Sequence, residues 1–229
     1  MRPSTRPDTT PAALLGAAIV VGLAAEARLA RRLGLPVAIG GGTADGARGA
    51  AEALIARGVL GLISFGLAGG LDPALPSGTL LIPAGIRLAG RDVATDPALT
   101  RALGGPTPHV LLAGDTLAAE AAAKSRLHDA TGCAAIDLET AAVAAVAAGH
   151  GLPFAVLRAI CDPAGADLPP AARVALDPAG AIGAGRVLVS VLARPGQIPA
   201  LIALARHAAA ARGALVRHIA GLLWAAPPE

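Results

Sequence analysis

The sequence predicts an α/β fold in which a largely parallel or mixed sheet carries helices on both faces. Three observations favour this class. Short apolar runs typical of buried strands alternate with alanine-rich stretches of helical period along most of the chain. The length of 229 residues fits one α/β domain with a sizeable core. A content of 54% hydrophobic and only 15% charged residues disfavours disorder.

The N-terminal residues 1–11 are polar and contain proline, so we expect a flexible tail there, followed by a single domain over 12–229. Arg2 and Arg6 precede an apolar run at 12–25. This pattern is similar to a secretory signal peptide and is too short to span a membrane. Because a helical pattern follows the run without a break, a buried strand that leads into a helix is the favoured interpretation.

The remaining elements follow from hydrophobic periodicity and from the position of glycine and proline. Apolar runs predict strands at 14–22, 37–42, 61–65, 79–88 (interrupted by Pro83), 110–113 and 154–160. Helical spacing predicts helices at 24–33, 44–57, 96–103, 119–131, 186–192 and 199–223. An irregular, proline-rich stretch is expected from Pro163 to Pro178.

Two carboxylates follow consecutive strands in the segment 135–163, which is typical of a strand, an acidic turn, an alanine-rich helix and a buried strand. Glu139 follows the first of these strands and Asp162 the second. Ligands of open α/β sheets gather beyond the carboxyl ends of the strands, so both side chains are candidates for a site. Each has a structural alternative: an acid suits the first turn of a helix, where Asp137 can be the N-cap, and Asp-Pro commonly begins a turn.

Three further features are candidate parts of the same site. Glu26 lies near the start of the first helix, where an acid also complements the helix dipole. The glycine-rich loop 65–72 follows a strand, and its N–H groups can approach an anion or form only a tight turn. Arg158 lies within the strand that precedes Asp162. A buried arginine needs a carboxylate partner, so we expect it to orient a site acid.

Several classes of function are disfavoured. The net charge of +3 comes without a basic stripe interleaved with aromatic residues, which argues against nucleic-acid binding. The glycines at 40–42 and 46 do not form G-x-G-x-x-G, which argues against a dinucleotide-dependent oxidoreductase. The five histidines and two cysteines lack metal-ligand spacing, so no metal site is expected.

Four short blocks occur in a fixed order along the chain. They are G-L-A-A-E-A at 22–27, F-G-L-A-G-G-L-D-P at 65–73, A-I-D-L-E at 135–139 and R-A-I-C-D-P at 158–163. Taken together, they resemble the purine nucleoside phosphorylase and nucleosidase superfamily. L-P-P-A at 168–171 and R-P-G-Q at 194–197 are similar to the hopanoid-associated phosphorylase or nucleosidase group in particular.

The resemblance implies a three-layer α/β/α sandwich with a central mixed sheet, and cleavage of an N-glycosidic bond without a cofactor. By position, Asp162 matches the acid that protonates the purine at N7, and Glu139 matches the acid that binds the ribose hydroxyls. Glu26 matches the carboxylate that activates water in the hydrolytic branch. The other substrate-binding residues that it implies are Gly66, Leu67, Ala68 and Gly69 beside the nucleophile, Leu138 next to Glu139, and Leu117 near the base.

The chain departs from the family pattern at three places. Leu67 stands where related nucleosidases have a small hydroxyl residue. Thr116 and Leu117 occupy the region where relatives stack an aromatic ring on adenine, so an aliphatic clamp would replace the ring. Glu26 stands near the first strand, where the phosphorylase branch has phosphate-binding arginines. This last difference favours hydrolysis, with phosphate as co-substrate only in the phosphorylase alternative.

The expected substrate is a small adenosyl compound, adenosylhopane, which would give adenine and ribosylhopane. A phosphorylase, a methylthioadenosine or S-adenosylhomocysteine nucleosidase and a non-catalytic nucleotide-binding module are the alternatives. Relatives are often oligomeric, so we expect a homo-oligomer, located in the cytoplasm. The final helix combines apolar residues with arginines, which suits peripheral contact with the inner membrane, although such helices more often pack on the core or on a sister subunit.

Overall fold

The structure, a computed structural model, describes residues 11–173 and 184–225. Within them, nine strands form one mixed sheet: β1 (Ala17–Val21), β2 (Val37–Ile39), β3 (Gly61–Gly70), β4 (Leu80–Leu81), β5 (Gly85–Leu88), β6 (Arg91–Ala94), β7 (Leu111–Ala113), β8 (Ala135–Asp137) and β9 (Phe154–Asp162). Their order is β2-β1-β3-β8-β7-β5-β6, with β9 also beside β3 and β4 beside β9. β3 pairs in parallel with β1 and β9, and its last two residues pair antiparallel with the start of β8.

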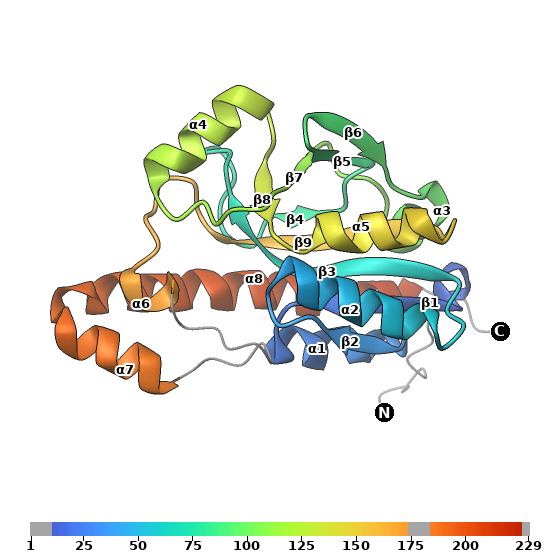
Figure 1. Cartoon of the computed structure of the whole chain (residues 1–229), viewed down its shortest axis with the longest axis horizontal. Helices are drawn as coiled ribbons and strands as arrows, with labels where there is room; N and C mark the ends of the chain where they lie inside the picture. Colours follow the sequence, from blue (N-terminus) through green and yellow to red (C-terminus); the bar gives the residue numbers. More distant parts are fainter. Residues whose placement is uncertain (1–10, 174–183, 226–229) are drawn as a thin grey trace, which may run out of the picture.

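Helices cover both faces of this sheet (Figure 1). They are α1 (Ala24–Ala30), α2 (Ala44–Ile55), α3 (Pro97–Ala102), α4 (Ala121–Thr131), α5 (Thr140–Gly149), α6 (Pro170–Arg173), α7 (Ala184–Ala193) and α8 (Ile198–Ala225). α2 and α5 lie on one face, and α1 and α8 lie on the other. The predicted three-layer α/β/α architecture with a central mixed sheet is therefore confirmed.

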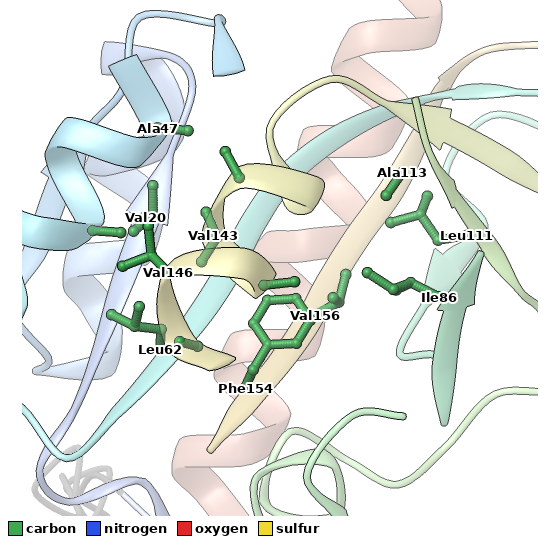
Figure 2. Packing of buried hydrophobic residues seen from close by; sticks show 14 of the residues in the cluster. Val20, Ala47, Leu62, Ile86, Leu111, Ala113, Val143, Val146, Phe154 and Val156 are labelled. Atoms are coloured by element: carbon green, nitrogen blue, oxygen red, sulfur yellow. The ribbon is translucent and has the colours of Figure 1, made fainter. Parts of the chain in front are cut away.

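The period of two along the central strands explains why both faces need helices. In β1, Val20 packs into the cluster formed with α2 and α5, whereas Ile19 packs into the cluster formed with α1 and α8. Figure 2 shows the first cluster, in which Val143 and Val146 of α5 meet the β-strand residues Val20, Leu62 and Val156. Alanines on α2 and α5 let these helices approach the sheet and each other closely.

The prediction of a glycine loop at 65–72 is wrong for most of its length, because β3 continues through Gly70. Gly66 pairs with Arg158 of β9, and Gly69 pairs with Ile136 of β8. β9 lies along one side of β3, while β1 and then β8 lie along the other side, and the register with β9 shifts between Ala68 and Gly69. Glycines suit such a β-bulge, because side chains of neighbouring segments approach the backbone closely there.

Smaller differences have local causes. The first strand starts at Ala17 because the residues before it form a 3-10 turn and Gly16 takes a positive φ of 85°. Its burial in the sheet confirms the strand interpretation of the apolar run. Pro83 splits the predicted strand at 79–88 into β4 and β5, and the edge strand β6 was not predicted because it is short, mostly exposed and begins with two charged residues. The stretch after Pro163 contains α6, while residues 1–10 and 174–183 lie outside the described part.

Helix α8 completes the second face of the sheet. In its C-terminal half Leu215, Ile219 and Leu223 are buried in the cluster with β1 and α1, while Ile198 and Ile202 at its start are exposed. Among residues 11–173 and 184–225, no helix is long and apolar enough to cross a membrane. Peripheral membrane contact, the cytoplasmic location and the homo-oligomer stay predictions.

Candidate active site

A cleft of about 240 Å³ opens at the carboxyl ends of β3, β8 and β9. Its lining brings together eight of the nine residues that the sequence nominated: Glu26, Leu67, Ala68, Gly69, Leu117, Leu138, Glu139 and Asp162. The ninth, Gly66, lies directly behind the lining, since a Cβ placed there would be 2.5 Å from Glu26 Oε1. The roles of these residues stay predictions, but their convergence follows from the strand-end position that each of the acids occupies.

Glu26 is held in the first turn of α1 by two backbone donors. The Leu23 N–H donates to Oε2 and the Leu67 N–H donates to Oε1, each at 2.8 Å. Burial and the nearby charge of Glu139 raise the pKa of Glu26 to about 7, although Arg158 and the two N–H groups oppose this shift. Glu26 therefore exchanges its proton near neutral pH, as a general base requires.

Arg158 of β9 organises a buried charge cluster beside Glu26. Its Nη2 lies 2.9 Å from Glu139 Oε2 and 2.5 Å from Asp137 Oδ2, and its Nη1 donates to the Leu67 carbonyl at 3.2 Å. The predicted carboxylate partner of this arginine is thus confirmed. Bonds from one guanidinium to several fixed acceptors leave little freedom to the side chains that it contacts.

Glu139 occupies the N-cap position of α5, but its side chain does not cap the helix. Asp137 does so instead, since its Oδ1 accepts the Thr140 N–H at 3.3 Å and its Oδ2 accepts the Thr140 hydroxyl at 2.5 Å. The structural role that the sequence allowed for both acids therefore belongs to Asp137. Glu139 is left to face the cleft, and burial raises its pKa while Arg158 opposes the increase.

Asp162 is the last residue of β9 and also lines the cleft. Its Oδ2 is 2.5 Å from Nζ of Lys124, a residue of α4 that is completely buried. Burial raises the pKa of Asp162, and the Lys124 charge lowers it in part. A carboxyl group with a raised pKa that still has a nearby counter-charge can act as an acid.

The sequence did not predict the contacts that Lys124, Asp137 and Thr140 make with the site residues. Lys124 carried one signal, because it is the only lysine in a chain whose other basic residues are arginine or histidine. That observation did not indicate a partner, since Asp162 is 38 positions away along the chain. Asp137 was assigned to capping alone, and its ion pair with Arg158 depends on the register of β8 and β9 around β3.

The region expected to hold a base is formed by aliphatic side chains. Leu117 is 48% exposed, and together with Ile136 and Asp162 it lines a recess of about 50 Å³ next to the main cleft. A larger and mainly apolar cavity of about 600 Å³ lies on the other side of Leu117, between β7 and α4. The residues present thus offer an apolar clamp instead of an aromatic ring.

Gly22 provides a test of the site geometry. A Cβ at this position would lie 2.0 Å from Glu139 Oε1, so Gly22→Ala should push the carboxylate away from Arg158 while the fold is retained. Losing a hydrogen bond to a charged partner costs about 1.5–3 kcal/mol, so we expect roughly a 10- to 100-fold higher KM for a nucleoside substrate. Steady-state kinetics measure the change in KM, and a thermal melt measures whether the fold is retained.

Gly49→Ala is the matched control, because a Cβ at Gly49 of α2 meets no atom within 4 Å. It should leave KM unchanged. An unchanged KM for Gly22→Ala as well would contradict a role of Glu139 in binding the substrate.

Comparisons with known proteins agree with this fold. The profile of a family described as Phosphorylase superfamily matches residues 39–193. A search of curated proteins found no significant match. Among solved structures, futalosine hydrolase of Helicobacter pylori is similar at a TM-score of 0.60 and 18% identity, over 77% of this chain and 96% of that one.

Two further structures have the same level of similarity. For 5'-methylthioadenosine/S-adenosyl homocysteine nucleosidase of Helicobacter pylori the TM-score is 0.59 at 18% identity, over 76% of this chain and 97% of the other. For S-adenosylhomocysteine nucleosidase of Streptococcus pyogenes it is 0.59 at 18% identity, over 77% and 95%. At this identity the likeness establishes a shared fold.

Proposed function

This chain belongs to the phosphorylase superfamily, and from that premise we propose that it is a nucleosidase that hydrolyses the N-glycosidic bond of an adenosyl compound. The observation that carries the proposal is Glu26. This acid faces the cleft, is fixed by two backbone N–H groups, and has a pKa of about 7. It is suited to take a proton from a water molecule that attacks the sugar.

The charge around Glu26 favours water over phosphate as the nucleophile. Glu26, Asp137 and Glu139 gather around the Arg158 guanidinium, which forms ion pairs with the latter two. Phosphate carries one to two negative charges near neutral pH, and like charges repel strongly in a poorly solvated site. The same carboxylates stabilise the positive charge that develops on the sugar when the bond breaks.

In the proposed reaction, the C1′–N9 bond breaks and its electron pair stays on the base. Asp162 transfers a proton to N7 of the purine, so that neutral adenine leaves. Water forms the new bond to C1′ and gives its proton to Glu26. Glu139 accepts hydrogen bonds from the ribose hydroxyls and fixes the sugar between the base and the nucleophile.

We propose adenosylhopane as the substrate, because the blocks at 168–171 and 194–197 are similar to the hopanoid-associated group. The apolar side chains of Leu23, Leu67 and Leu138 in the cleft suit a substrate with an apolar 5′ substituent. Methylthioadenosine is the second candidate. It is favoured by the fold shared with the 5'-methylthioadenosine/S-adenosyl homocysteine nucleosidase of Helicobacter pylori and the S-adenosylhomocysteine nucleosidase of Streptococcus pyogenes.

The test is adenine release from adenosylhopane and from methylthioadenosine, each with and without phosphate, in ¹⁸O-labelled water. We expect release that does not depend on phosphate and one ¹⁸O atom on C1′ of the sugar product. Release that requires phosphate and yields a sugar 1-phosphate would contradict hydrolysis. No release from either compound, with adenine still bound in a calorimetric titration, would identify a non-catalytic binding module.

A further inference from the structure

The most unusual charge outside the Arg158 cluster is the buried Lys124. Its Nζ donates to Asp162 Oδ2 at 2.5 Å, to the Ala166 carbonyl at 2.9 Å and to the Pro163 carbonyl at 3.1 Å. These three acceptors match the three protons that a lysine ammonium group can donate. Burying an ammonium costs several kcal/mol even when it is paired, so its position calls for an explanation.

Lys124 restricts how Asp162 can act. Because the ammonium occupies Oδ2, the acidic proton of Asp162 has to reside on Oδ1. The two carbonyls come from the segment that directly follows β9, so Lys124 also ties this segment to α4. Asp162 is therefore held between a strand end and a helix, with one oxygen available to the cleft that it lines.

We propose that Lys124 is a positioning residue for proton transfer: it fixes the carboxyl group of Asp162 and stabilises the carboxylate that remains after the base is protonated. The inference rests on the proposed function. In the step, the O–H bond at Oδ1 breaks, an N–H bond forms on the base, and the electron pair stays on Asp162. The Lys124 ammonium keeps its protons throughout and neutralises the new charge.

Other titratable groups also face Asp162. His207 of α8 lies near enough to favour its ionised form, and its Nδ1 is 3.0 Å from Ser77 Oγ. Cys161 is adjacent in β9, and burial raises the pKa of its thiol to about 12, so it stays neutral in the working range. Lys124 is the larger influence, because it alone combines charge with a direct hydrogen bond to the Asp162 side chain within the described part of the chain.

The decisive experiment compares Lys124→Met with wild type in the adenine-release assay across pH. We expect kcat to fall by about 10²-fold, similar to the removal of one preorganised donor, with KM nearly unchanged. Without the ammonium, the pKa of Asp162 should increase. Since Asp162 has to be protonated to act, the loss of activity at high pH should move to higher pH in the variant.

Arg48→Met is the matched control, because it removes a positive charge from an exposed position of another helix, α2, and Arg48 lines none of the cavities described above. It should retain the wild-type kcat and pH profile. If Lys124→Met does not fold, as judged by circular dichroism, Lys124→Arg replaces it. The arginine variant keeps the positive charge, so the high-pH limb should stay in place while kcat falls.

Two results would overturn the inference. The first is a Lys124→Met enzyme with the wild-type kcat and pH profile. The second is a Lys124→Met enzyme with a lower kcat whose activity is lost at the same high pH as in the wild type. The second result would mean that Lys124 only holds the 163–166 segment. In Lys124→Arg, movement of the high-pH limb of the activity profile would also overturn the inference. These results differ from a failure of the proposed function, in which the wild-type protein itself releases no adenine.

Discussion

Asp162→Asn is expected to lower kcat for adenine release by about 10²–10⁴-fold, the usual contribution of a general acid. An amide has nearly the shape of the carboxyl group and cannot supply the proton that the leaving base requires. The fold should persist, because the amide oxygen can still accept the hydrogen bond from Lys124. Single-turnover kinetics with the substrate of the proposed reaction would measure the loss without interference from product release.

Asp167→Asn is the matched control for this variant. Asp167 follows in the same segment, is exposed, and accepts the Ala121 N–H at the start of α4, which an asparagine oxygen can also do. It should show wild-type turnover. A near-normal rate for Asp162→Asn would remove Asp162 from the chemistry and, with it, the role inferred for Lys124.

Glu26→Gln is expected to have an effect of similar size, about 10²–10⁴-fold on kcat, because glutamine cannot accept a proton from water. The pH dependence is the sharper signature. With a pKa of about 7, Glu26 is ionised and active above that pH, so wild-type kcat/KM should increase between pH 6 and 8. The variant should lack this increase.

Glu52→Gln controls for the loss of a negative charge, since Glu52 lies on the surface of α2 and pairs there with His150. It should keep both the rate and the pH profile. A wild-type profile that is flat between pH 6 and 8 would contradict the assignment of Glu26 as the base.

The raised pKa of Glu26 also affects stability. The unfolded chain releases this proton near the ordinary value of 4.5, whereas the folded protein retains it to about pH 7. Its contribution to folding is therefore fully present below pH 4.5 and is lost as the pH rises to 7. Ionised Glu26 is the form that catalysis needs and the form that the fold tolerates less well.

The three acids could be predicted from the sequence because their positions depend on local rules. Asp162 and Glu139 follow buried strands, Glu26 lies in the first turn of a helix, and strand ends of an α/β sheet converge. Their partners depend on packing between distant segments. Lys124 reaches Asp162 only because α4 lies against the segment after β9, and no local pattern specifies that contact.

The error at the glycine segment has a related cause. Leu67 to Gly70 read as a loop because glycine has a low intrinsic preference for strands. In the fold, β8 and β9 both flank this segment, and their hydrogen bonds outweigh that preference. Leu67 lies between the stretches of β3 that pair with β1 and with β8, and its N–H donates to Glu26, so this part of the strand supports the candidate base.

The position of α8 has a consequence for how the chain is made. Leu14 and Ala17, near the start of the described chain, share a buried cluster with residues of α8, namely Leu215, Ile219 and Leu223. Helix α8 is the last element of the described chain, so the ribosome makes it after all the others. The part of this face that α1 does not cover therefore stays exposed until α8 has been made. Contacts between residues so far apart in the sequence slow folding and prolong the exposure of apolar surface that is prone to aggregate. The nascent chain should therefore depend on chaperones more than a chain whose contacts are mainly local.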